Sequence, residues 1–192
     1  MKVAITGGIG SGKSFVCRML AERGISIYDC DAAAKRLMRT SERLRRQLTA
    51  LIGPATYLDD GMLNKREVAQ FLLASEQNAR AIDSIVHPAV AEDFRQSGLD
   101  WMECAILFES GFDRLVDRVI VVTAPETVRI ERIMARDGIT DEKAREWIGK
   151  QWPQNSLRQR ADYEIVNDGS MPLAPQIERI INLINQLDHL EK

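Results

Sequence analysis

The sequence predicts an α/β fold in which a parallel sheet is covered by helices, and three observations lead to this prediction. Short apolar runs rich in β-branched residues alternate with longer amphipathic stretches, as expected when helices connect parallel strands. The 192 residues suit one domain that carries small insertions. Hydrophobic residues make up 45% and charged residues 28%, which is ordinary for a globular protein and argues against disorder.

The regular elements can be placed in chain order. Five apolar runs are expected to form the strands of the sheet: residues 2–6, 25–29, 103–109, 118–123 and 163–167. A helix is expected over residues 14–24, where Gly24 ends an amphipathic stretch. Residues 174–187 form a closing helix whose apolar side chains share one face: Ile177, Ile180, Ile181, Ile184 and Leu187.

Two stretches interrupt the alternation of strands and helices. Residues 32–96 are mostly helical in pattern, with turn-like breaks at 53–54 and 59–61. Residues 137–162 are polar, charged and helix-like, with no strand pattern. We expect both stretches to be insertions at the carboxyl edge of the sheet, which is where open α/β sheets bind ligands.

Composition and charge limit the class of protein. The formal net charge is −2, whereas a dedicated nucleic-acid binder is usually basic. Cys17, Cys30 and Cys104 are odd in number and widely spaced, which fits a reducing compartment better than a disulfide framework. No basic and apolar leader is present, and no apolar run approaches the ~20 residues that span a bilayer. We therefore expect a cytoplasmic protein that binds neither nucleic acid nor membrane.

The stretch "GGIGSGKS", residues 7–14, carries the strongest functional signal. It fits G-x-x-x-x-G-K-[ST] and lies between a predicted strand and a predicted helix. In this motif the glycines let backbone N–H groups surround phosphate oxygens, and the helix directs its positive end at the same anion. Lys13 can reach the β- and γ-phosphates, and Ser14 can bind Mg²⁺. The alternative is a glycine-rich turn without a ligand.

The motif therefore predicts a nucleoside triphosphate site. The residues expected to hold the nucleotide are Gly8, Ile9, Gly10, Ser11, Gly12, Lys13, Ser14 and Phe15. A GTPase usually carries N-K-x-D, but the only "NK" here continues as "NKRE" at 64–67, and no D-x-x-G follows the loop. A short core, an insertion and an arginine-rich stretch favour a small kinase.

The acidic pair in "YDCDAAAKRL", residues 28–37, follows the second predicted strand. Asp29 and Asp31 are expected at the carboxyl edge of the sheet, where a carboxylate can orient a hydroxyl and accept its proton. Asp31 is equally suited to cap the helix that follows, so both roles stay open from spacing alone. Asp29 is expected to be structural or to orient metal and substrate.

Arginines recur in "ETVRIERIMARDG", residues 126–138. In a helix, Arg129, Arg132 and Arg136 fall on one face, beside an apolar face. Such arginines can neutralise charge on a transferred phosphoryl group. A solvated charged face explains the same spacing.

Together these motifs resemble the dephospho-CoA kinase family nearly from end to end. The family's phosphate loop, D-x-D pair, His-Pro segment, L-F-E segment, lid and closing A-D…N-x-G segment have counterparts here, in the same order: residues 6–14, 29–31, 61–90, 105–111, 132–140 with 150–153, and 161–169. The loop is common to many enzymes, whereas the combination is specific.

The resemblance implies a P-loop NTPase-type, three-layer fold with a central five-stranded parallel sheet. It divides the chain into a nucleotide-binding core (1–31, 86–135 and 163–192), a helical CoA-substrate-binding insertion (32–85) and a lid (136–162). It implies that the chain uses ATP and Mg²⁺ to phosphorylate the ribose 3′-hydroxyl of dephospho-CoA, giving CoA and ADP in the last step of CoA synthesis.

The resemblance also implies residue roles. Asp31 becomes the general base, Lys13 and Ser14 take the usual loop roles, Arg132 and Arg136 become phosphate clamps, and Asn167 falls where the family cradles adenine. Residues expected to bind the acceptor are Asp29, Asp31, Lys35, Lys65, Arg80, His87 and Glu109. His87, before Pro88, can instead be a turn or packing residue, and Glu109 can simply cap a loop. A monomer or weak homo-oligomer is expected.

Four positions depart from the family pattern. Phe15 replaces the usual Thr after the loop serine, Cys30 and Ala105 replace Ala and Pro, and Arg129 stands where Gln is common. None of these changes removes a residue that the mechanism needs. Two other functions remain as alternatives, a kinase for a different small molecule and a nucleotide-binding switch.

Overall fold

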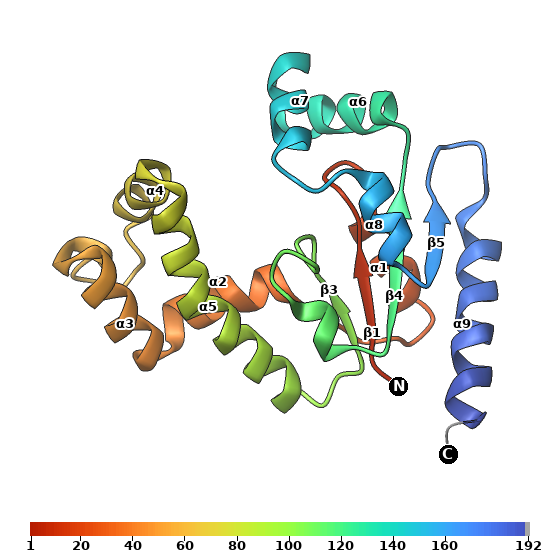
Figure 1. Cartoon of the computed structure of the whole chain (residues 1–192), viewed down its shortest axis with the longest axis horizontal. Coiled ribbons are helices and arrows are strands. Elements are labelled where there is room, and N and C mark those ends of the chain that lie inside the picture. Colours follow the sequence, from red (N-terminus) through yellow and green to blue (C-terminus); the bar gives the residue numbers. More distant parts are fainter. Residues whose placement is uncertain (191–192) are drawn as a thin grey trace. The chain divides into compact units, whose positions relative to one another are not determined.

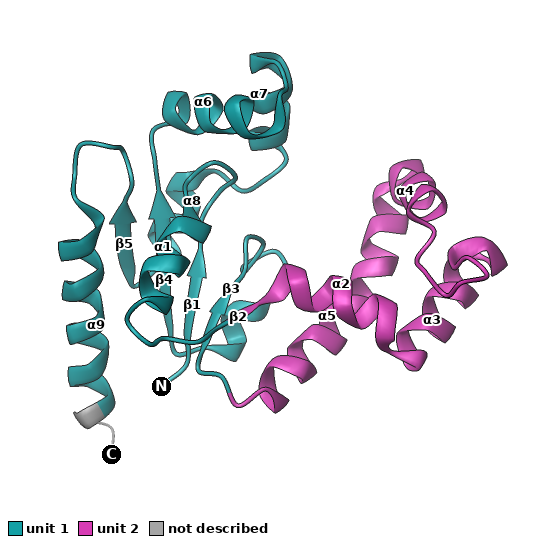
Figure 2. Cartoon of the chain, turned by 180° about the vertical axis from the view of Figure 1, so that it is seen from behind, with its two compact units in different colours: residues 1–27, 99–192 teal, residues 28–98 magenta. Residues whose placement is uncertain are grey.

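The computed structural model describes residues 1–190, which divide into two compact units. Unit 1 comprises residues 1–27 and 99–192, and unit 2 comprises residues 28–98 (Figure 2). Within the described residues no helix is both long and apolar enough to cross a membrane.

A central sheet organises the fold (Figure 1). Among the described residues it has five strands in the order β2-β3-β1-β4-β5. Strand β1 pairs in parallel with β3 and β4, and β4 pairs in parallel with β5. The strands are β1 (Val3–Thr6), β2 (Ile27–Asp29), β3 (Trp101–Glu103), β4 (Arg118–Thr123) and β5 (Tyr163–Val166). The predicted five-stranded parallel sheet is therefore confirmed.

Helices cover both faces of the sheet, as predicted for a three-layer fold. Helices α1 (Lys13–Ala21) and α9 (Leu173–Leu190) bury one face over an apolar cluster that includes Val3, Ile5 and Ile120. Val119 and Val121 point to the opposite face, because successive strand residues alternate. Helix α8 (Gln154–Arg160) packs there against β4, with Leu157 buried.

Three further helical segments belong to unit 1. Helix α6 (Glu126–Asp137) follows β4, and α7 (Asp141–Gly149) follows α6. Ile130 and Ile133 of α6 bury against Ala144 of α7, with Trp147 packed beside them. A short 3₁₀ helix, η2 (Phe112–Leu115), precedes β4. The predicted lid, residues 136–162, thus spans the end of α6, α7, α8 and their connections.

Unit 2 is helical, as predicted for the first insertion. Its elements are α2 (Cys30–Thr40), α3 (Glu42–Ile52), the 3₁₀ helix η1 (Pro54–Thr56), α4 (Lys65–Ala74) and α5 (Glu76–Gln96). Helix α5 packs against α2, α3 and α4, and buries Ile82, Val86 and Phe94. The predicted boundary at residue 85 falls inside this continuous helix, which runs through Pro88.

The strand predicted at residues 103–109 is wrong in position. Strand β3 occupies Trp101–Glu103, and residues 105–111 form turns, in which the N–H of Ser110 donates to the carbonyl of Ile106 at 2.9 Å. The apolar run misled the prediction because Leu107 and Phe108 are buried from a turn rather than from a strand. A buried turn and a buried strand give the same short apolar pattern.

Candidate functional site

The phosphate loop, residues 7–14, lies between β1 and α1 as the motif predicts. Gly12 stands at the start of α1 with a φ of 93°, which favours glycine, and a Cβ there would overlap the amide nitrogen of Asn167. No side chain caps α1, and its first turn holds no acidic residue. The N-terminus of α1 is therefore a positive helix end suited to an anion.

Lys13 folds back on this loop. Its Nζ donates to the carbonyl oxygen of Gly7 at 2.6 Å. Burial lowers the pKa of Lys13, and the carboxylate of Glu103 opposes that shift. The ammonium group is thus held beside the loop by a hydrogen bond to a neutral carbonyl. An anionic ligand can take the place of that carbonyl as its partner.

Ser14 lies beside an acidic residue that sequence reasoning missed. Its hydroxyl donates to Glu103 Oε1 at 3.2 Å. Glu103 is the last residue of β3, at the carboxyl end of the strand, where the misplaced strand had put Glu109. Glu109 instead lies in the following turn, with its Oε1 3.5 Å from the backbone nitrogen of Trp152.

A hydroxyl and a carboxylate side by side match the donors that Mg²⁺ takes in phosphate sites. This ion is bound by one or two protein oxygens, with substrate phosphates and water completing its shell. Among the described residues no cluster of three or more His, Cys, Asp or Glu side chains forms a metal site. Ser14 and Glu103 therefore fit a magnesium ion that arrives with a nucleotide better than a resident metal.

Asn167 and Arg132 contact the loop although both are far from it in the sequence. Asn167 follows β5 and is fixed there, since its N–H donates to the carbonyl of Thr123 at 2.7 Å. Its side-chain amide donates to Ser11 O at 2.9 Å. The Arg132 guanidinium lies 3.4 Å from both Gly10 O and Ser11 O and 3.3 Å from Asn167 Oδ1. The structure thus brings Arg132 and Asn167 together at residues 10–12.

The other two arginines of α6, Arg129 and Arg136, lie in different environments. Arg136 is exposed and pairs with its neighbour Asp137 at 2.7 Å, so the structure does not bring it to the loop. Arg129 is buried, with 5% of its surface exposed, and its Nε donates to Ile9 O at 2.8 Å. The solvated-face alternative is therefore wrong for Arg129.

Ile9 and Phe15, two more residues of the predicted nucleotide site, have identifiable contacts in unit 1. The N–H of Ile9 donates to Gln151 Oε1 at 2.6 Å, which joins the predicted lid to the loop. Sequence reasoning missed Gln151, because 142 positions separate it from Ile9. Phe15 is about half exposed, and the Arg18 guanidinium lies 5.4 Å from the centre of its ring.

The acidic pair of unit 2 takes two different roles. Asp29 is the N-cap of α2, and its Oδ1 accepts the N–H groups of Asp31 and Ala32, both at 2.9 Å. The sequence had suggested Asp31 as this cap. Asp31 instead directs its carboxylate to Lys35 Nζ at 2.9 Å, and both side chains are exposed. The Asp31 carboxylate is thus free of any capping role.

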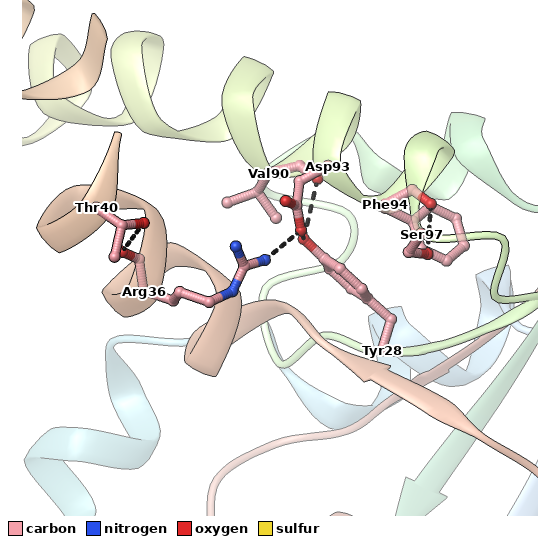
Figure 3. A network of polar contacts seen from close by, with 7 residues as sticks. All are labelled: Tyr28, Arg36, Thr40, Val90, Asp93, Phe94 and Ser97. Atoms are coloured by element: carbon pink, nitrogen blue, oxygen red, sulfur yellow. Dashed lines mark hydrogen bonds and ion pairs between the residues drawn. The ribbon is translucent and has the colours of Figure 1, made fainter. Parts of the chain in front are cut away.

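A polar network around the buried Tyr28 fixes the start of α2 against α5 (Figure 3). The hydroxyl of Tyr28 donates to Asp93 Oδ2 at 2.7 Å, and Arg36 of α2 pairs with the same carboxylate oxygen. Burial and the neighbouring Asp93 raise the pKa of Tyr28, so its hydroxyl stays protonated. The three side chains tie Tyr28, which precedes the acidic pair, to helix α5.

The remaining acceptor residues lie on separate helices of unit 2. Lys65 opens α4, and Arg80 lies on α5, where it pairs with Glu76 at 3.1 Å. His87 also lies on α5, one residue before Pro88, with Nε2 at 3.5 Å from Asp83 Oδ1. The expectation of a turn at His87 is wrong, because α5 continues through it. Arg80 and His87 are seven positions apart and so share a helix face.

Comparison with known proteins gives consistent matches. A family model described as dephospho-CoA kinase matches residues 1–172. Dephospho-CoA kinase from Bacteroides fragilis is 39% identical over 98% of this chain and 95% of its own length. The enzyme of the same name from Porphyromonas gingivalis is 42% identical over 95% and 93%. A crystal structure from Thermus thermophilus superposes with a TM-score of 0.80 at 29% identity, covering 97% of this chain and 96% of that one.

Proposed function

The chain belongs to the dephospho-CoA kinase family, and we propose that it transfers the γ-phosphoryl group of ATP to the ribose 3′-hydroxyl of dephospho-CoA. The observation that carries this proposal is the family match over residues 1–172, which includes the phosphate loop and the acidic pair. CoA and ADP would be the products. The geometry of each unit supports separate sets of residues for the phosphoryl donor, ATP, and for the acceptor, dephospho-CoA.

On the donor side, the loop residues from Gly8 to Phe15 bind the phosphates of ATP through backbone N–H groups. Lys13 exchanges the carbonyl of Gly7 for β- and γ-phosphate oxygens, where negative charge shifts during transfer. Arg132 supplies a second positive charge, which its contacts with Gly10 O and Ser11 O place beside the loop. Asn167 supports the same backbone and lies next to the nucleotide.

Magnesium would be held by Ser14, with Glu103 as a further oxygen donor. When bound, the ion would neutralise negative charge on the phosphates. The protein's own part is to hold the serine hydroxyl and the carboxylate together at the carboxyl end of β3.

On the acceptor side, Asp31 is the general base. It can take this role because Asp29 caps α2 and leaves the Asp31 carboxylate exposed. Lys35 Nζ lies 2.9 Å from that carboxylate, and the hydrogen bond with Asp31 raises the pKa of Lys35. An ionised carboxylate can orient the ribose hydroxyl and accept its proton.

The other acceptor contacts are proposed from the family pattern and from exposure. Lys65 and Arg80 are exposed cations of unit 2 that suit the phosphate groups of a CoA precursor. His87 shares the α5 face of Arg80, and Asp29 and Glu109 complete the proposed set. Arg136, which is exposed and pairs with its neighbour Asp137, would reach phosphate through movement of the lid. We place the enzyme in the cytoplasm as a monomer or weak homo-oligomer.

The test is acceptor-dependent ADP release. Purified protein with ATP and Mg²⁺ should release ADP when dephospho-CoA is present, and EDTA should stop the reaction. Adenosine and AMP serve as alternative acceptors. Faster phosphorylation of either one would assign the chain to a different small-molecule kinase, and ADP release unchanged by any acceptor would favour a nucleotide switch.

A further inference from the structure

Arg129 is a buried cation directly behind the phosphate loop. It comes from α6, and its Nε donates to the carbonyl of Ile9 at 2.8 Å. Only 5% of its surface is exposed, which is unusual for arginine. The sequence had placed it with Arg132 and Arg136 on a helix face that could neutralise phosphoryl charge, but had given no contact with the loop backbone.

The loop is shaped around this side chain. A Cβ added to Gly8 would lie 2.5 Å from one terminal nitrogen of the guanidinium and 2.9 Å from its central carbon. A Cβ on Gly10 would lie 2.6 Å from the carbonyl oxygen of Arg129. The guanidinium and the helix backbone therefore occupy the space that side chains at Gly8 and Gly10 would need.

The charge on Arg129 has no close counter-charge. Among residues 1–190 no carboxylate oxygen forms an ion pair with its guanidinium within 4.0 Å. Burial lowers the pKa of Arg129, and the carboxylate of Glu126, which is 3.1 Å from Arg145, opposes that shift. Arg129 in turn lowers the pKa of Lys13. A buried cation without a close ion pair is costly, unless an anion binds nearby.

We propose that Arg129 is a positioning residue for the phosphate loop, and that the phosphate chain of a bound nucleoside triphosphate is its missing counter-charge. The hydrogen bond to Ile9 O holds the loop backbone from outside. The positive charge acts on the phosphates through the loop, in addition to Lys13. This inference rests on the proposed nucleotide site.

Three substitutions separate the hydrogen bond from the charge. Arg129→Gln keeps an N–H donor for Ile9 O and loses the charge. Arg129→Lys keeps the charge and loses the planar fork. Arg129→Met loses both and keeps most of the volume. Arg179→Gln, at an exposed position of α9, makes the same change in net charge and serves as the matched control.

The measurements are ATP affinity by calorimetry, melting temperature with and without ATP, and kcat and KM. We expect Arg129→Gln and Arg129→Met to weaken ATP binding about tenfold or more, as for loss of a charge acting on a bound anion. Arg129→Lys should recover most of that affinity. Without ATP, Arg129→Met should melt no lower than the wild-type protein, because it removes an uncompensated buried charge. Its ATP-induced rise in melting temperature should be smaller.

A merely structural arginine would behave differently. It would give a lower melting temperature without ATP, with ATP affinity unchanged in Arg129→Gln, and that result would overturn the inference. Lys13→Ala separates this failure from failure of the proposed function. If the wild-type protein binds ATP and Lys13→Ala weakens binding, the nucleotide site stands and only the role of Arg129 is lost. If the wild-type protein binds no ATP, the proposed function fails as well.

Discussion

Charged side chains that contact the phosphate loop are held by backbone carbonyls, whereas the exposed ion pairs on helices α2 and α5 hold one another in solvent. Lys13, Arg129 and Arg132 each donate to a loop carbonyl, and Arg129 is buried. In unit 2, Asp31 pairs with Lys35, and Arg80 with Glu76, at exposed positions four residues apart. Exposed pairs of this kind contribute little to stability.

This difference predicts how substitutions at the phosphate loop and in unit 2 will affect binding, turnover and stability. Donor-side cations are part of the loop's shape, so their loss should change both phosphate binding and turnover. The exposed charges of unit 2 are accessible to a substrate, so their loss should change activity while leaving the fold intact. The following variants test that contrast, beginning with the largest expected effect.

Asp31→Asn should give the largest loss of activity. An amide cannot accept the hydroxyl proton, so kcat should fall by roughly 10²–10⁴-fold, the usual effect of losing a positioned base. The melting temperature and ATP affinity should stay at wild-type values, because Asp29 rather than Asp31 caps α2. Steady-state kinetics and thermal melting check both statements. Lys35→Ala is a useful companion, since it removes the ion-pair partner and keeps the base. Retention of most activity in Asp31→Asn would transfer the base role elsewhere.

Lys13→Ala should come next. It removes positive charge from oxygens where charge shifts during transfer, so kcat should fall by at least ~100-fold. Circular dichroism should be unchanged. Within residues 1–190 the Lys13 side chain makes one hydrogen bond, to the Gly7 carbonyl, so its loss removes little that holds the fold. Lys143→Ala, at an exposed lid position, is the matched control and should have nearly wild-type turnover. Near-normal turnover in Lys13→Ala would contradict the interpretation of the loop.

Asp93→Ala should have a smaller effect, and on stability first. The variant leaves the hydroxyl of Tyr28 and the guanidinium of Arg36 without their shared acceptor. Because the Tyr28 hydroxyl keeps a second acceptor, the carbonyl of Val90 at 3.3 Å, the loss should be about 1 kcal/mol, the usual net contribution of one hydrogen bond, which denaturant unfolding would measure. Because this network fixes the start of α2, kcat should also fall, by less than in Asp31→Asn. A stability equal to wild type would show that the network does not anchor α2.

The same network predicts a pH dependence. The pKa of Tyr28 is raised in the folded protein from an ordinary value of 10.0 by burial and by Asp93. The unfolded chain therefore loses this proton at lower pH than the folded protein, so the stabilisation is complete below about pH 10 and is lost as the pH rises further. Unfolding between pH 9 and 11 should show a steeper loss in wild type than in Tyr28→Phe. Parallel curves would contradict it.

Local patterns in the sequence predicted the parts of this site that are encoded locally. The loop lies between a strand and a helix because its motif needs only eight consecutive residues, and α9 follows from the spacing of its apolar residues. For Asp31 the spacing left a cap and a base both open, and the structure gives the cap of α2 to Asp29. Both aspartates suit a cap, and the choice depends on where α2 begins.

Contacts between distant segments could not be predicted in this way. Gln151 reaches Ile9 across 142 positions, and Arg129 reaches it across 120. Neither residue has a local signal that distinguishes a loop contact from a solvated helix face. Glu103 was missed for another reason: the apolar turn after it shifted the predicted strand, and with it the expected carboxyl end.

Substitution of Asp29 by Asn should have the smallest effect on stability and activity. It tests most closely whether the cap and the base at the start of α2 are separate residues. Its carboxylate caps α2 through the N–H groups of Asp31 and Ala32, and Asn caps a helix about as well as Asp. Asp29→Asn should therefore leave stability within about 0.5 kcal/mol of wild type, whereas Asp29→Ala should cost about 1 kcal/mol. Hydrogen exchange at the amides of Asp31 and Ala32 should rise only in the alanine variant. Since the proposed base lies two residues away, Asp29→Asn should also keep far more activity than Asp31→Asn. An equal loss of activity in the two asparagine variants would mean that both carboxylates act on the substrate, and that the separation of cap from base at the start of α2 is wrong.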